Sequence, residues 1–137
     1  MRYLVDTNTL SDMRRGPKGN AGVHAWASSV ADTDLFISVI TIKEIELGIL
    51  SKWRSDKTQA LMFRTWLDHV VLTNYRGRIL NVDIEVAQRA AALDVPDRRP
   101  TADGLIAATA LVHNMTVATR NVSDFRPMGV ATLNPFI

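Results

Sequence analysis

Short apolar runs alternate with longer segments of helical spacing along the chain. The short runs predict buried strands at residues 3–5, 35–39, 79–82, 116–119 and 130–133. Between them, apolar residues recur at intervals of three and four and predict helices at residues 8–15, 20–31, 41–53, 56–72, 84–93 and 101–113. Strands that alternate with helices form a parallel sheet covered on both faces. The pattern therefore predicts a three-layer α/β/α fold with a central, mainly parallel sheet of four to five strands.

Length and composition favour one ordinary domain. The chain has 137 residues, so we expect residues 1–137 to form a single domain. It contains no cysteine, which excludes a disulfide framework and any thiolate metal site and fits a cytoplasmic location. No apolar stretch reaches the roughly 20 residues of a membrane span. The first apolar run ends at Asp6, too early for a secretory signal.

The charge balance leans slightly towards polyanionic partners. The net charge is +2 and the pI is about 9.3. The basic residues occur in short clusters, namely Arg14, Arg15 and Lys18; Lys52, Arg54 and Lys57; Arg76 and Arg78; and Arg98 and Arg99. Each cluster taken alone is explained by solubility. Several clusters around one acidic pocket would instead form a rim that binds phosphates.

Four acidic residues occupy similar places in the predicted layout. Two of them, Asp6 and Asp124, follow strands, and the other two, Glu44 and Asp103, lie in the first turn of a predicted helix. Ligands of open parallel sheets bind beyond the carboxyl ends of the strands. We therefore expect these four side chains to meet at that edge of the sheet.

Each carboxylate also has a purely structural explanation. Asp6 fits the N-cap of a helix, and Thr41 with Glu44 fits a capping box. Asp103 complements a helix dipole, and Asp124 fits the cap of a turn. For any one residue taken singly, both interpretations stay open.

Taken together, four bare carboxylates at one edge would repel one another. Such a cluster persists when a cation neutralises it or when some members keep a proton, and a divalent metal ion is the simpler solution. The available ligands are oxygen atoms, which suit Mg²⁺ or Mn²⁺ rather than Zn²⁺. Thr119 and Asn121 could hydrogen-bond a carboxylate or a water on the metal, or could simply form a tight turn.

Four segments, in this order and spacing, carry a resemblance to a known family. They are residues 4–8, residues 38–45 with Gly48, residues 102–110 and residues 119–125, and residues 134–136 close the chain in the same way. In these segments the chain resembles the PIN-domain ribonucleases, and specifically the VapC/FitB-type toxins of type II toxin–antitoxin systems.

The resemblance implies a metal-dependent endoribonuclease that hydrolyses RNA phosphodiester bonds with a carboxylate-bound Mg²⁺ or Mn²⁺. It implies catalytic and metal-binding roles for Asp6, Glu44, Asp103 and Asp124, and supporting roles for Asn8, Thr119 and Asn121. It further implies a homodimer, a small antitoxin partner of the VapB/FitA type, and binding of operator DNA by the complex of the two. The alternative is a nucleic-acid-binding regulatory partner in such a complex, with little or no nuclease activity.

The helix predicted from Thr41 bears on the question of partners. Its apolar residues cover more than one face, and they are Ile42, Ile45, Leu47, Ile49, Leu50 and Trp53. One face must cover the sheet. The other face is covered either by a partner or by a thicker helical layer of the same chain.

Overall fold

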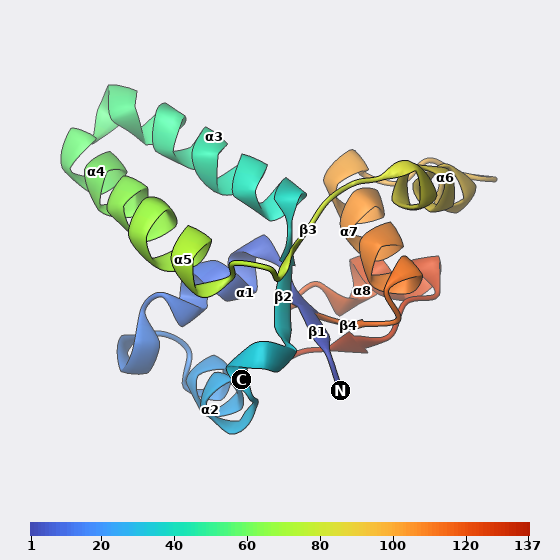
Figure 1. Ribbon diagram of the computed structural model, residues 1–137, viewed down its shortest axis with the longest axis horizontal. Helices are drawn as coiled ribbons and strands as arrows, with labels where there is room; N and C mark the ends of the chain where they lie inside the picture. Colours follow the sequence, from blue (N-terminus) through green and yellow to red (C-terminus); the bar gives the residue numbers. More distant parts are fainter.

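A parallel sheet of five strands forms the centre of the computed structural model, which describes residues 1–137. The strands are β1 (Tyr3–Val5), β2 (Leu35–Ser38), β3 (Ile79–Leu80), β4 (Thr116–Ala118) and β5 (Thr132–Leu133). Their order is β3-β2-β1-β4-β5, and every neighbouring pair is parallel. Helices lie on both sides of this sheet (Figure 1). The predicted α/β fold is confirmed.

Helices connect the strands and supply the two outer layers. They are α1 (Thr7–Met13), α2 (Ala21–Ser29), α3 (Val39–Ser55), α4 (Lys57–Trp66), α5 (Leu72–Asn74), α6 (Ile84–Leu93), α7 (Thr101–Val112) and α8 (Val122–Phe125). Short 3₁₀ helices span Gly16–Lys18, Asp32–Asp34 and Arg126–Met128. None of the helices has both the length and the apolar character needed to cross a membrane.

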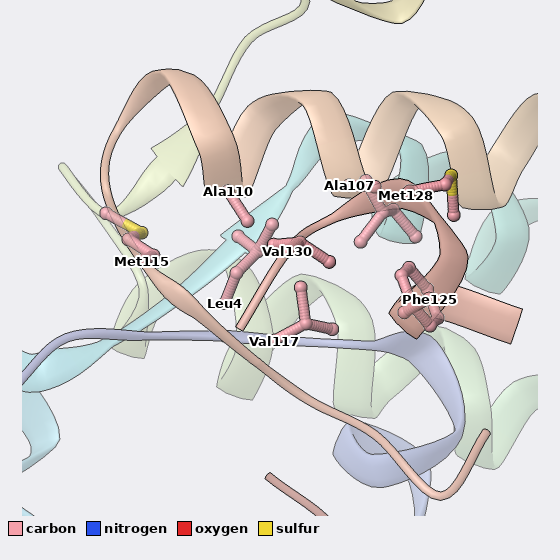
Figure 2. Packing of buried hydrophobic residues seen from close by; sticks show 9 residues of the cluster. Leu4, Ala107, Ala110, Met115, Val117, Phe125, Met128 and Val130 are labelled. Carbon is pink, nitrogen blue, oxygen red and sulfur yellow. The ribbon is translucent and has the colours of Figure 1, made fainter. Parts of the chain in front are cut away.

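Side chains that alternate along β1 divide the core into two halves. Leu4 points to the α7 side, where it packs with Val117 and Phe125 under α7 and α8 (Figure 2). Val5, the next residue, points to the other side and packs with Ile37 and Ile45. Successive side chains of a strand face opposite sides of the sheet, so a fully buried strand such as β1 must be apolar at consecutive positions.

The helices α3 and α4 pair as a hairpin that projects away from the sheet (Figure 1). Buried Ile45 and Ile49 of α3 join the core, whereas Leu47, Leu50 and Trp53 are exposed. The helical layer of this chain therefore covers only part of the apolar surface that the sequence indicates on α3.

Most helix boundaries differ from the sequence prediction by one or two residues, and two of the differences have a local cause. Helix α3 begins at Val39 rather than Thr41, because the Ser38 hydroxyl accepts a hydrogen bond from the Ile40 N–H at 3.0 Å and caps the helix there. The helix predicted over residues 56–72 contains a wider π-helical turn at Leu67–Val71. This turn keeps both Leu67 and Val71 buried in the core beside α3.

Candidate active site

The candidate site lies at the carboxyl ends of the central strands. Beside β1, the order in which the chain adds strands to the sheet reverses. From β1 the order runs through β2 and β3 on one side and through β4 and β5 on the other. Such a switch point leaves a crevice at the carboxyl ends of the strands. Asp6 directly follows β1 at this point and is only 5% exposed. Its backbone N–H donates to the Ala118 carbonyl at 3.1 Å and so joins the ends of β1 and β4.

The Asp6 carboxylate is held in place by the first helix. Its Oδ1 accepts a hydrogen bond from the Thr9 N–H at 2.9 Å, so Asp6 is the N-cap of α1, as one interpretation of the sequence predicted. The Thr9 hydroxyl donates to the Ala118 carbonyl at 3.2 Å. This capping uses one carboxylate oxygen and leaves Oδ2 without a hydrogen bond inside the chain.

The prediction of a capping box between Thr41 and Glu44 is wrong. Because Ser38 caps α3, Glu44 lies beyond the first turn and does not satisfy the helix terminus. Instead its Oε1 accepts a hydrogen bond from the Thr7 hydroxyl at 2.5 Å, and Thr7 Oγ1 lies 3.1 Å from Thr41 Oγ1. Thr7, the residue after Asp6, therefore ties Glu44 to the start of α1.

Sequence reasoning missed the role of Thr7. The only signal for it was its place beside Asp6 in the segment of residues 4–8. The contact joins α1 to α3 across 37 positions of the chain, and spacing along the sequence cannot indicate such a pairing.

The negative charges of the other three carboxylates act on Asp103. It lies in the first turn of α7. Burial raises the pKa of Asp103 above its ordinary value, and the negative charges of Asp124, Glu44 and Asp6 raise it further. A carboxylate near a helix N-terminus is normally stabilised by the helix dipole. Here burial and repulsion outweigh that effect, so the charges of Asp124, Glu44 and Asp6 all act on Asp103.

The segment after β4 forms a turn and a short helix rather than a loop. The Thr119 hydroxyl accepts a hydrogen bond from the Asn121 N–H at 2.9 Å, and the Asp124 N–H donates to the Asn121 carbonyl at 3.0 Å. Thr119 is fully buried, and its hydroxyl serves this turn. Asp124 lies within α8 and does not cap it. The turn thus carries Asp124 towards Asp103.

Two of the polar residues to which the resemblance gives a supporting role lie at the surface. Asn8 and Asn121 are both exposed, and neither side chain makes a hydrogen bond within the chain. Both lie close in sequence to residues of the acidic cluster, so they are available to a ligand there.

The four carboxylates are not arranged as a complete set of metal ligands in this structure. No group of three or more acidic or histidine residues is close enough to hold a metal ion. The physical reason is that Asp6 is held by α1 and Glu44 by Thr7, while like charges without a counter-ion stay apart. No basic side chain compensates them either, because the ion pairs of this chain are those of Arg64 with Glu46 and Asp68.

The donor set nevertheless fits a divalent cation. It consists of carboxylate oxygens only, from four separate elements of the fold, and its negative charge is uncompensated. Hard oxygen donors of this kind suit Mg²⁺ or Mn²⁺. The fold and the position of this acidic cluster together define the class of protein.

The chain belongs to the PIN domain family, whose model matches residues 3–128. It is 38% identical over 138 residues to the protein named Toxin FitB of Neisseria gonorrhoeae, and the match covers 97% of each chain. It is 32% identical to VapC ribonuclease Y4jK of Sinorhizobium fredii, over 97% of this chain and 96% of that protein. The solved structure of FitAB bound to the IR36 DNA fragment superposes with a TM-score of 0.85 at 35% identity, over 97% of this chain and 94% of the matched chain.

Replacing Asp103 with asparagine should stabilise the metal-free protein. The raised pKa means that Asp103 adds stability below the ordinary aspartate pKa of about 3.9, and that this stability is lost as pH rises through the higher pKa of the folded state. Above that window the folded chain carries the full cost of a buried, charged Asp103 and of its repulsion by the neighbouring carboxylates, and Asp103→Asn removes both. We expect the thermal midpoint near pH 7.5 to rise by roughly 2 °C in the presence of chelator. Equal midpoints at pH 7.5, or a gain that persists at pH 3, would exclude the ionised Asp103 carboxylate as the cause.

Proposed function

We propose that this protein is a metal-dependent endoribonuclease and the toxin component of a type II toxin–antitoxin module. The observation that supports the proposal is the place of Asp103 in a PIN-domain fold, where burial raises its pKa and the negative charges of Asp124, Glu44 and Asp6 raise it further. A relative over nearly the whole length is named a ribonuclease, which supports the same activity.

In this proposal Asp6 and Asp103 hold a Mg²⁺ or Mn²⁺ ion, and Glu44 and Asp124 complete the site directly or through waters. When bound, the ion supplies water activation near neutral pH and stabilises negative charge on the phosphodiester. The hydrolysis adds water across the bond, and its products are a 5′-phosphate and a 3′-hydroxyl end. Single-stranded RNA is the substrate that fits, because its phosphates reach a crevice that duplex RNA cannot enter.

Hydrogen bonds from neighbouring residues fix the orientation of two of the carboxylates. Thr9 fixes Asp6 through its N–H, and Thr7 orients Glu44 through its hydroxyl. Both contacts leave carboxylate oxygens free for other ligands. Asp103 retains a proton to higher pH than an ordinary aspartate, since its pKa is raised, and a cation in the site would favour its ionised form. Asn8, Thr119 and Asn121 support the site through the adjoining helix and turn.

The proposed partners follow from the relatives and from the surface. One relative is named a toxin, and the matched structure is of FitAB bound to a DNA fragment. We therefore propose a small antitoxin of the VapB/FitA type, which binds operator DNA together with the toxin. The exposed Leu47, Leu50 and Trp53 of α3 support an additional contact between copies or with that antitoxin. Residues 1–137 act as one domain in the cytoplasm, where the RNA substrate is found.

Incubation of the purified protein with mixed single-stranded RNA tests this function. We expect cleavage with Mg²⁺ or Mn²⁺, no cleavage with excess chelator, and recovery when the ion is restored. Sequencing of the ends should find 5′-phosphates on the products. Cleavage that resists chelator, or ends that carry 2′,3′-cyclic phosphates, would contradict the proposal. Tight RNA binding without cleavage under any ion would favour the regulatory alternative.

A further inference from the structure

A second groove lies beside the acidic cluster. Its volume is about 380 Å³, and its lining includes Asn8 and Ser11 of α1 together with Arg120 and Phe136. Asn8 is two positions after Asp6, and Arg120 directly follows Thr119 at the end of β4. One end of this groove therefore lies at the crevice that contains the carboxylates.

The groove carries uncompensated positive charge. Three arginines line it, Arg14, Arg15 and Arg120, and all three are exposed and form no ion pair. The one carboxylate in the lining, Asp12, accepts a hydrogen bond from the Asn20 N–H at 2.9 Å. The groove thus presents guanidinium groups that have no carboxylate partner, next to a site whose own charge is negative.

Aromatic rings alternate with these arginines. The Arg120 guanidinium lies 4.9 Å from the centre of the Phe136 ring, and the Arg14 guanidinium lies 4.5 Å from the centre of the Phe63 ring. Both rings are partly exposed within the groove. Cations that follow a backbone, next to ring faces that accept bases, are the combination with which proteins bind single-stranded nucleic acid.

The groove shares lining residues with another groove that Glu44 lines. Ser11 and Phe63 also line a neighbouring groove of about 220 Å³, and Thr7 and Glu44 line that groove as well. A strand that lay across Arg14 and Arg120 would therefore lead to the side of Glu44. The negative phosphates of such a strand suit both ends of this path. At one end they pair with the arginines, and at the other they bind a cation held by the carboxylates.

We propose that this groove, lined by Arg14, Arg15, Arg120, Phe63 and Phe136, binds the single-stranded RNA substrate on one side of the cleaved phosphate. The inference rests on the proposed ribonuclease function and names the path of its substrate. The arginines hold phosphates, and the Phe136 ring stacks on a base. An acidic protein segment would pair with the arginines but would not use the ring faces, so the aromatic residues favour RNA.

Binding of a fluorescein-labelled, mixed-sequence single-stranded 12-mer RNA tests the groove without cleavage. Fluorescence anisotropy is measured in chelator, with a poly-glutamate peptide and a duplex RNA as competitors. Arg14→Gln combined with Arg120→Gln should weaken binding about tenfold or more and lower the slope of log K against log salt by about 1.4, or about 0.7 for each phosphate contact. Phe136→Leu keeps the apolar contact, removes the ring face and should weaken binding about tenfold.

The matched control is Arg54→Gln combined with Arg76→Gln, which removes the same charge from two exposed positions outside the groove. We expect its affinity to stay within about twofold of the wild type. Equal losses in the two double variants would overturn the inference, since they would reflect net charge alone. The inference would also be overturned if the poly-glutamate peptide displaced the labelled RNA more effectively than duplex RNA or unlabelled single-stranded RNA does.

Cleavage assays separate this inference from the proposed function. Groove variants that bind and cut RNA as the wild type does would refute the groove and leave the ribonuclease intact. A wild type that binds RNA through the groove but cuts no RNA with any divalent ion would refute the ribonuclease and support the groove as an RNA site.

Discussion

Asp6→Asn is expected to abolish RNA cleavage and to leave the fold intact. The substitution removes a charged ligand from the proposed metal site, and such ligands supply several kcal/mol of stabilisation to the reaction. We therefore expect the single-turnover rate to fall about a thousandfold or more. The fold should survive, because asparagine caps helices as well as aspartate does and its Oδ1 can still accept from the Thr9 N–H.

Asp83→Asn is the matched control for this prediction. Asp83 caps α6 in the same way, with its Oδ1 accepting from the Val86 N–H at 2.9 Å, and it is no part of the acidic cluster. Its substitution should leave the cleavage rate within a factor of about two of the wild type. The free energy of unfolding should change by no more than about 0.5 kcal/mol. Cleavage by Asp6→Asn at more than a tenth of the wild-type rate would refute the assignment of Asp6.

Phe125→Ala should be the most destabilising single truncation in the core beneath α7. The Phe125 side chain is 1% exposed and packs among the residues of the cluster around Leu4 and Val117 (Figure 2). Loss of a buried phenylalanine costs about 3–5 kcal/mol through lost burial and the cavity left behind. Since domains of this kind are stable by about 5–15 kcal/mol, such a loss is a large share of the total.

Urea denaturation measures this cost, and Phe125→Leu is its control. Leucine keeps most of the volume, so its cost should be nearer 1–1.5 kcal/mol, or about a third of that of alanine. Phe125 also anchors α8, which carries Asp124, so the alanine variant should lose activity even at temperatures where it stays folded. A loss below about 1 kcal/mol for Phe125→Ala would mean that the packing around it is not as described.

The sequence predicts the layers of this fold well because its signals there are local. The apolar runs of β1 and β2 are short and buried on both faces, and each helix follows its strand closely. The edge at which the acidic residues gather follows from the rule that ligands of parallel sheets bind where the strands end together. The order of strands and helices thus predicts Asp6, Glu44 and Asp124 at this edge, with Asp103 reaching it from the start of a helix, and the meeting of the four side chains stays a prediction.

The details of the site depend on contacts between distant segments, which spacing does not reveal. Ser38, rather than Thr41, caps α3, because the Ser38 hydroxyl accepts the hydrogen bond from the Ile40 N–H. The hydrogen bond from Thr7 to Glu44 spans two helices. The groove beside the site needs Phe136 of the last segment next to α1, and only the folded chain brings these together.

The central claim is that the acidic cluster binds a divalent cation, and thermal unfolding of the wild type and Asp103→Asn with added Mn²⁺ tests it most directly. In chelator at pH 7.5 the variant should be the more stable of the two, because burial and, in addition, the neighbouring negative charges raise the pKa of Asp103 in the wild type. Millimolar Mn²⁺ should reverse the order by raising the wild-type midpoint several degrees and leaving that of the variant almost unchanged. Equal shifts in both proteins, or none in either, would contradict a metal site at these carboxylates.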